Sequence, residues 1–267
     1  VTRPMDVNSD GNMLTVYRQY AGLNTTHGQL GAGYGVVTDQ GDIQWNAQQN
    51  VNSNGNPPWG GGGVGGCGSA QARYPSGIAS EEYPYAVWNE YTAGPPTCPA
   101  WPTGCSSYGG RPYVSYDEFG WGGESWLYPA ELDPLWDCDK DLWSGSVGYG
   151  YDQATGEHHV SAVYDDWTRN GHFLYTSEAV EDGYIVLGTE TLIVHPLHLG
   201  TEGYSSRSIL SMNDNGQGLL GLDGIFAGND MDAGTCLPPA SNLTCNKTPM
   251  FKITNDYGEN WIGNHAS

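Results

Sequence analysis

The sequence predicts an all-β protein, a β-propeller built of four-stranded antiparallel blades, of which four are recognisable in the chain. Two observations support this fold. A seven-residue pattern, in which small–Val–aromatic is followed by two polar residues and another aromatic, occurs three times without gaps. No segment shows a sustained helical period with capping residues. A fixed repeat period indicates that one supersecondary unit is used several times.

The three copies of the pattern occupy residues 14–20, 85–91 and 161–167, and a weaker fourth copy is expected around Ile225. Val16, Val87, Val163 and Ile225 serve as anchors, separated by 71, 76 and 62 residues. The three valines are therefore expected at equivalent positions in the second strand of their units.

Each copy is flanked by other runs of β-branched and aromatic residues bounded by Gly, Asn or Asp turns, which are typical of strands. In the first unit these runs are 4–7, 34–39 and 43–45. Four such strands make one propeller blade. A β-sandwich is the alternative, but it gives no reason for a long period. The expected single domain spans 1–267, with blades at 1–47, 73–130, 143–190 and 204–264 and insertions at 48–72 and 93–110.

The last unit contains a more specific motif at residues 254–261. Its Thr254, Asp256, Gly258 and Trp261 match the Asp-box pattern, with Asn260 in the usual Thr place. The chain thus resembles the Asp-box (BNR-repeat) propellers, a superfamily that includes sialidases. The resemblance places the motif in the turn between the third and fourth strands of a blade. There the Asp would bond turn backbone and the Gly would take a positive φ. Such a turn is structural and does not itself imply catalysis.

The charge of the chain excludes some partners. With 9 Lys+Arg against 30 Asp+Glu, the formal net charge is −21. Nucleic acid and anionic membranes are poor partners for such a surface. The most apolar stretch, 184–199, is too short and polar for membrane insertion. An acidic surface with few lysines suits a saline, calcium-containing exterior, and solubility alone is the alternative explanation.

Cysteines and glycosylation motifs predict a secreted or cell-surface location. Six cysteines are an even number without zinc-ligand spacing. The expected disulfides are Cys98–Cys105, Cys236–Cys245 and Cys67–Cys138. Three sequons in loop-like stretches predict a glycoprotein, at Asn24, Asn242 and Asn246. The start at Val1, without a basic and apolar leader, suggests a processed chain.

One candidate metal site lies near the N-terminus. Asp6, Asn8 and Asp10, followed by Gly11, match the first half of a calcium loop. The bidentate acid expected at the twelfth position of such a loop is replaced by Tyr17. An ordinary hairpin turn is the alternative. No other cofactor is expected.

Three arginines, Arg3, Arg73 and Arg207, each open the first strand of a unit. If these strands line the central channel, the guanidiniums could bind a carboxylate or a glycan there. Sialidases use an arginine triad in this way. However, the family's Arg-Ile-Pro motif is reduced here to Arg3-Pro4, and the third unit has no such arginine. No catalytic nucleophile can be assigned from the sequence, and pairing with nearby acids is the structural alternative.

These observations together favour a non-catalytic structural or interaction module, such as a subunit of an extracellular assembly. The expected partners are proteins, a second copy of the chain, or cell-surface glycans. Two alternatives remain open: a sialidase-like glycoside hydrolase and a carbohydrate-binding, lectin-like module.

Overall fold

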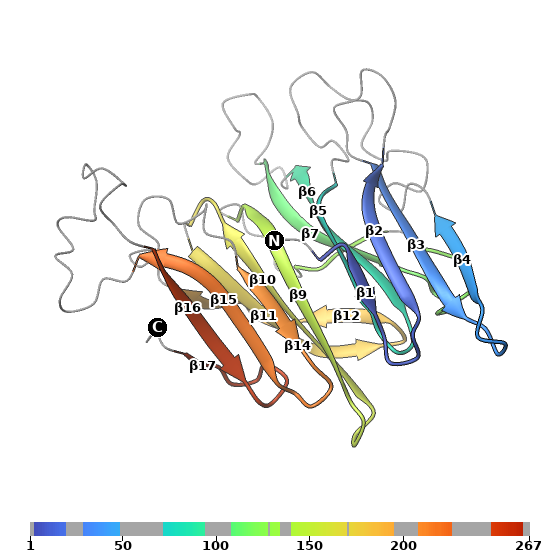
Figure 1. Ribbon diagram of the computed structural model, residues 1–267. Helices are drawn as coiled ribbons and strands as arrows, with labels where there is room; N and C mark the ends of the chain where they lie inside the picture. The colour runs from blue at the N-terminus through green and yellow to red at the C-terminus, as the bar shows by residue number, and fades with distance from the viewer. Residues whose placement is uncertain are drawn as a thin grey trace.

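The computed structural model describes residues 3–19, 29–48, 72–93, 108–127, 129–133, 140–169, 171–194, 208–225 and 247–263. Every regular element in these ranges is a β-strand. The strands form four sheets, each built of antiparallel neighbours in chain order (Figure 1). No helix in the described ranges is long and apolar enough to span a membrane.

We call the four sheets blades 1 to 4. Blade 1 contains β1 (Met5–Val7), β2 (Met13–Gln19), β3 (Gln29–Val37) and β4 (Ile43–Gln48). Blade 2 contains β5 (Arg73–Ala79), β6 (Pro84–Ala93), β7 (Tyr108–Tyr116) and β8 (Ala130–Glu131). Blade 3 contains β9 (Leu142–Asp152), β10 (Glu157–Asp166), β11 (Gly171–Glu181), β12 (Tyr184–Leu187) and β13 (Thr191–Val194). Blade 4 contains β14 (Ile209–Met212), β15 (Gly218–Ile225), β16 (Lys247–Thr254) and β17 (Ile262–Gly263).

The three anchor valines occupy equivalent places, as predicted. Val16, Val87 and Val163 lie in β2, β6 and β10 and are 0%, 3% and 0% exposed. In chain order, each belongs to the apolar cluster that joins its blade to the next one. The repeat in the sequence therefore records how consecutive blades pack against each other.

The fourth anchor was misplaced. In blade 2, Val87 pairs with Ser76, three residues before β5 ends, and the equivalent pair in blade 4 is Gly221 with Ile209. Ile225 lies four residues farther on, at the end of β15. The pattern is weak there because glycine supplies no side chain at the anchor position.

Two details of strand pairing were also not predicted. In blade 2 the described residues 125–127, where a fourth strand would lie, form only an isolated bridge, between Asp117 and Trp126, and regular pairing resumes at β8. Pro129, which lies between them, has no N–H to donate to a ladder. In blade 3, β13 adds a fifth strand by pairing with β11.

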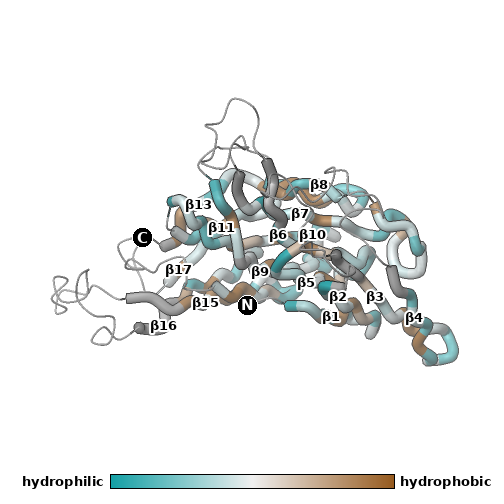
Figure 2. The backbone as a smooth tube through the Cα atoms, turned by 90° about the horizontal axis from the view of Figure 1, so that it is seen from above, coloured by the Kyte–Doolittle hydropathy of each residue, from teal (hydrophilic) through white to brown (hydrophobic). Residues whose placement is uncertain are grey.

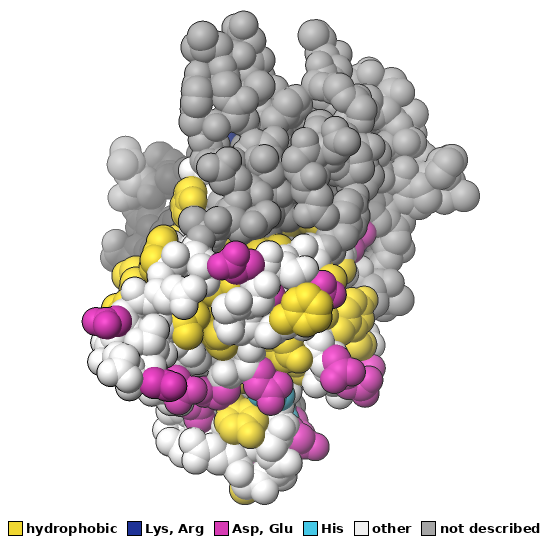
Figure 3. Space-filling view, turned by 90° about the vertical axis from the view of Figure 1, so that its right-hand side faces the viewer, with side chains coloured by type: hydrophobic (Ala, Val, Ile, Leu, Met, Phe, Trp, Pro, Cys, Tyr) yellow, Lys and Arg dark blue, Asp and Glu magenta, His cyan; other side chains and the backbone are white. Residues whose placement is uncertain are grey.

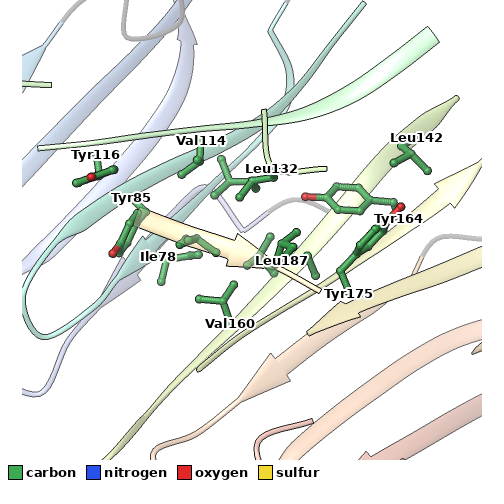
Figure 4. Packing of buried hydrophobic residues seen from close by; sticks show 14 of the residues in the cluster. Ile78, Tyr85, Val114, Tyr116, Leu132, Leu142, Val160, Tyr164, Tyr175 and Leu187 are labelled. Atoms are coloured by element: carbon green, nitrogen blue, oxygen red, sulfur yellow. The ribbon is translucent and has the colours of Figure 1, made fainter. Parts of the chain in front are cut away.

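The core consists of the apolar layers between blades. The largest layer lies between blades 2 and 3 and is rich in tyrosine (Figure 4). Tyr85 and Tyr116 pack with ring centroids 5.3 Å apart, and Tyr164 and Tyr175 meet edge to face at 6.0 Å. Such ring pairs add stabilisation beyond the area they bury.

The first strands of the blades meet along a common axis. β1 lies beside β5, β5 beside β9 and β9 beside β14 (Figure 2). Hydrogen bonds cross these junctions: Gly77 N donates to Arg3 O at 2.8 Å, and Leu210 N donates to Ser146 Oγ at 2.9 Å. This arrangement of radial sheets around inner strands is that of a β-propeller.

The surface carries the acidic excess of the sequence. On the face that Figure 3 shows, Asp and Glu are the predominant charged side chains, and they alternate with hydrophobic groups. Pairs of acids near one another on such a surface favour cations or neutral ligands over anions.

Candidate functional site

A cavity of about 160 Å³ lies where the inner strands of all four blades meet. We call it the channel cavity. Its wall is lined by Arg3 and residues 6–9 of blade 1, Ile78, Ala79 and Glu81 of blade 2, Val147 and Tyr149 of blade 3, and 212–214 of blade 4. Three of the lining side chains are carboxylates, each from a different blade. In a ring of sheets only the axis can bring such distant segments together.

Asp6 is one of these carboxylates, with a side chain 10% exposed. Its Oδ2 accepts a hydrogen bond from the backbone N of Ala79 at 2.9 Å, and its Oδ1 forms an ion pair with Arg3. Burial raises the pKa of Asp6, although the Ala79 bond and the Arg3 charge oppose this. Burial thus favours the protonated form of Asp6.

The other two carboxylates sit in turns that follow first strands. Glu81 Oε2 accepts from Ser9 Oγ at 2.9 Å, and Asp214 Oδ1 accepts from the backbone N of Tyr151 at 3.0 Å. Tyr149 completes the wall. Its hydroxyl lies 2.7 Å from Nδ1 of His158, and burial raises the pKa of Tyr149. A phenol held neutral in this way can donate a hydrogen bond to a ligand.

The predicted calcium ligands lie in the hairpin between β1 and β2. Asp6 pairs with Arg3, while Asn8 donates to Ser80 O at 3.1 Å and accepts from Asn12 N at 2.9 Å. Asp10 is exposed. Within the described ranges no group of three or more His, Cys, Asp or Glu could hold a metal ion. Calcium binding at this turn stays a prediction.

Two of the three predicted arginines are described. Arg3 lines the channel cavity, with a side chain 47% exposed, and Arg73 opens β5 opposite Asn89. Arg207 lies outside the described residues. The carboxylate-binding role proposed for these arginines therefore rests on Arg3, which already has Asp6 as a neighbour.

The Asp-box-like segment forms the turn between β16 and β17. Asp256 Oδ1 accepts from Thr254 Oγ1 at 2.6 Å and from Asn260 N at 2.9 Å, and Gly258 has a φ of 92°. Trp261 Nε1 donates to Gly258 O at 2.9 Å. The corresponding turns of the other blades also contain glycines with positive φ, at Gly41, Gly120 and Gly183.

Several predictions concern segments outside the described residues. They include all six cysteines, Cys67, Cys98, Cys105, Cys138, Cys236 and Cys245, and the three sequon asparagines, Asn24, Asn242 and Asn246. The disulfides and glycans therefore stay predictions.

A second group of charges, between blades 2 and 3, was missed in the sequence. Lys140 Nζ lies 3.0 Å from Asp133 and 3.4 Å from Glu190. Arg169 bridges Glu190 and Asp166, with its Nε 2.6 Å from Asp166. Burial alone would raise the pKa of Glu190, but hydrogen bonds from Arg169 and Tyr175 outweigh it and lower the pKa to about 2. Because these acids are matched by bases, we interpret this network as structural.

Another buried pair, Asp165 and His172, was also missed. His172 Nδ1 lies 2.7 Å from Asp165 Oδ1, and both residues are 0% exposed. The two residues are partners in the register of β10 and β11. Their spacing in the sequence carries no motif, so only strand pairing identifies them.

The sequence and the structure of the chain were compared with those of known proteins. No protein-family model and no curated protein sequence matches the chain. An α-L-arabinofuranosidase from Lactobacillus brevis is similar in structure, with a TM-score of 0.51 and 10% identity over 98% of this chain and 71% of that one. An exo-1,5-α-L-arabinanase from a bovine ruminal metagenomic library has a TM-score of 0.49, with 10% identity and coverages of 98% and 73%. A sucrose-6-phosphate hydrolase from Lactobacillus gasseri has 0.42, with 7% identity and coverages of 92% and 45%.

These comparisons support a β-propeller and correct the functional prediction. The similar arabinofuranosidase is a glycoside hydrolase, which contradicts the expectation of a non-catalytic module. The resemblance to Asp-box propellers is supported only at the level of a β-propeller, and the similar arabinofuranosidase is not a sialidase. At 10% identity the likeness establishes the fold, and the chemistry must be argued from the cavity.

Proposed function

We propose that the protein is a glycoside hydrolase that cleaves a terminal sugar in the channel cavity. One observation carries this proposal: the carboxyl groups of Asp6, Glu81 and Asp214, from three blades, line one cavity on the propeller axis. Most glycoside hydrolases need two carboxyl groups, one to protonate the leaving oxygen and one to act as base or nucleophile. The fold shared with an α-L-arabinofuranosidase supports the same reaction class.

We assign the acid role to Asp6. A general acid works best when its pKa approaches the working pH, and burial raises the pKa of Asp6. Its neighbour Arg3 would bind the substrate or neutralise Asp6 after proton transfer. Glu81 and Asp214, on blades 2 and 4, supply the second carboxylate. Two carboxyl groups in different environments are the arrangement that separates acid from base.

The size of the cavity limits the substrate. Pockets for drug-sized ligands measure about 300–1,000 Å³, whereas this one measures about 160 Å³. A single terminal sugar unit therefore suits it better than an internal stretch of polymer. We take α-L-arabinofuranosides as first candidates from the similar structure, and sialosides as second, because Arg3 offers a guanidinium to a carboxylate. Such substrates agree with a location outside the cell.

The test is turnover of 4-nitrophenyl glycosides, arabinofuranoside and sialoside included, by the purified chain. Asp6→Asn, Glu81→Gln and Asp214→Asn keep side-chain shape but remove a carboxyl group. General acid–base groups typically contribute about 10²–10⁴-fold, so we expect Asp6→Asn and one of the other two to lose kcat/KM in that range. Asp39→Asn, at an exposed turn position outside the cavity, is the matched control. Sugar binding without turnover, or turnover that all three variants retain, would contradict the proposal.

A further inference from the structure

Tyr149, in the wall of the channel cavity, is hydrogen-bonded to a histidine that does not line the cavity. His158 pairs with Tyr151 in the register of β9 and β10, and Tyr149 lies two residues from Tyr151, on the same face of β9. The Tyr149 hydroxyl oxygen is 2.7 Å from Nδ1 of His158. The ring centroid of His158 is 4.8 Å from that of Tyr151. Strand pairing and ring packing thus hold His158 against Tyr149.

The hydroxyl of Tyr149 also lies close to the carboxylates proposed for catalysis. Burial, and after it the charges of Glu81 and Asp214, raises the pKa of Tyr149, while hydrogen bonds from the Glu81 backbone and the Ser80 side chain oppose this. Tyr149, Glu81 and Asp214 line the same cavity. A sugar bound there would therefore meet the phenol oxygen together with two carboxylates.

The protonation of His158 decides where the Tyr149 proton points. A phenol carries one proton and can donate one hydrogen bond at a time. While Nδ1 of His158 is unprotonated it accepts this proton, and Tyr149 meets a ligand only as an acceptor. When His158 is protonated, both of its ring nitrogens are donors. Nδ1–H then donates to the Tyr149 oxygen, and the phenol proton is free to turn toward the cavity.

Carboxylates offer counter-charges to a protonated His158. Its Nε2 is 3.8 Å from Oε2 of Glu82, in the turn between β5 and β6. His158 also lines a second cavity, of about 400 Å³, whose lining includes the carboxylates of Glu157, Glu178, Glu181 and Glu259. The other titratable side chains beside it are Tyr151 of β9 and His159 of β10. Imidazole is the side chain whose ordinary titration falls between about pH 5 and 8, so these two pH values are the ones to compare.

We propose that His158 is a positioning residue for the sugar site: its protonation changes the Tyr149 hydroxyl from an acceptor into a donor toward the bound sugar. This inference rests on the proposed function, because it takes the channel cavity as the place where the sugar binds. Ring and hydroxyl oxygens of a sugar accept hydrogen bonds, so the donor form of Tyr149 adds one bond to the substrate. One neutral hydrogen bond typically strengthens binding by about 2- to 10-fold.

The experiment measures KM and kcat at pH 5 and pH 8 for the 4-nitrophenyl glycosides that the chain turns over. For the wild-type protein we expect KM to be lower at pH 5, by about 2- to 10-fold. Tyr149→Phe has no phenol proton and should show the higher KM at both pH values. His158→Phe removes the acceptor, so the Tyr149 proton stays free, and should show the lower KM at both. His159→Phe keeps a ring beside Tyr257, 4.2 Å away between centroids, and is the matched control, with the wild-type change in KM.

Nitrogen-15 NMR of the histidine side chains tests the same inference without turnover. The signals of His158 are those missing from the His158→Phe spectrum. At pH 8 we expect Nδ1 to be unprotonated and the proton to be on Nε2, a preference that should weaken in Tyr149→Phe. A proton on Nδ1 at pH 8, or a KM that changes equally with pH in all four proteins, would overturn the inference. Absence of turnover would refute the proposed function alone, because the NMR result still decides whether His158 holds the Tyr149 proton.

Discussion

Asp6 in blade 1 accepts a hydrogen bond from the backbone nitrogen of Ala79 in blade 2, at 2.9 Å. The carboxylate that we propose as the acid is thus held in part by the neighbouring blade. Its second oxygen is held by Arg3, three residues earlier. The packing of blade 1 against blade 2 and the proposed chemistry consequently both depend on the Asp6 side chain.

Removing this carboxylate should weaken the contact between blades 1 and 2. Asp6→Ala leaves the buried Ala79 N–H without its acceptor, which typically costs about 1–3 kcal/mol. Asp6→Asn keeps one amide oxygen and should lose clearly less. Urea denaturation of both variants measures the difference. Equal destabilisation by Ala and Asn would show that the charge of Asp6, and not its hydrogen bond to Ala79, stabilises the contact between blades 1 and 2.

The network around Glu190 should make stability fall in acid. The folded pKa is about 2, below the ordinary value of about 4.3. The stabilisation is present above the ordinary value and is lost as pH falls towards 2. Glu190→Gln should cost about 2 kcal/mol at pH 7 and much less at pH 3, because a partner of Arg169 and Lys140 is lost. Urea midpoints at both pH values test this, and an unchanged difference between them would contradict it.

Glu131 should behave in the opposite way. Burial raises its pKa to about 7, although Arg111, 3.7 Å away, opposes the shift. The folded protein therefore binds this proton more tightly than the unfolded chain, and stability falls as pH rises from about 4.3 to about 7. Glu131→Gln removes the titration and should be the more stable protein at pH 8, by about 1–3 kcal/mol. Thermal melts at pH 5 and pH 8 provide the comparison. A variant less stable at pH 8 would show that the Arg111 contact dominates.

The turn between β16 and β17 should tolerate no side chain at its glycine. Gly258 has a φ of 92°, and a Cβ there would lie 2.6 Å from Ser161 Oγ in blade 3. Gly258→Ala should cost about 2 kcal/mol or more through strain and displacement of that contact. Asp256→Ala removes side-chain hydrogen bonds within the same turn, such as the one from Asn260 N, and should lower the free energy of unfolding by about 1 kcal/mol. Asn255→Ala, at an exposed position, serves as control in the same denaturation series.

The fold could be predicted from the sequence because blade packing repeats. Val16, Val87 and Val163 recur since each fills the same space against a following blade. Gly221 occupies that position in blade 4, so the pattern misled at Ile225. Local rules for turns also held, as the positive φ of Gly258 shows. Sequence patterns set by residues close together in the chain, such as turns, were thus reliable predictors of structure.

The candidate site could not be predicted because its parts are far apart in sequence. Asp6, Glu81 and Asp214 meet only once the inner strands surround the axis. The sequence suggested two separate roles for Asp6 and Arg3, in a cation site and in a carboxylate site. In the structure each is the other's ion-pair partner, at positions i and i+3 where the first strand begins. Lys140 and Glu190 likewise meet only through contact between blades.

The large sequence separation of the residues that join blades 1 and 2 also affects how the chain folds. The hairpins are local, with Val7 opposite Met13 and Ala79 opposite Pro84. The bonds that join blades 1 and 2 are not local: Asn8 to Ser80 spans 72 residues and Tyr34 to Asp117 spans 83. Closing loops of that length is entropically slow, and proteins dominated by such contacts refold over milliseconds to seconds. Individual sheets should therefore form early and associate late, with their apolar faces open to one another, and to other chains, in the interval.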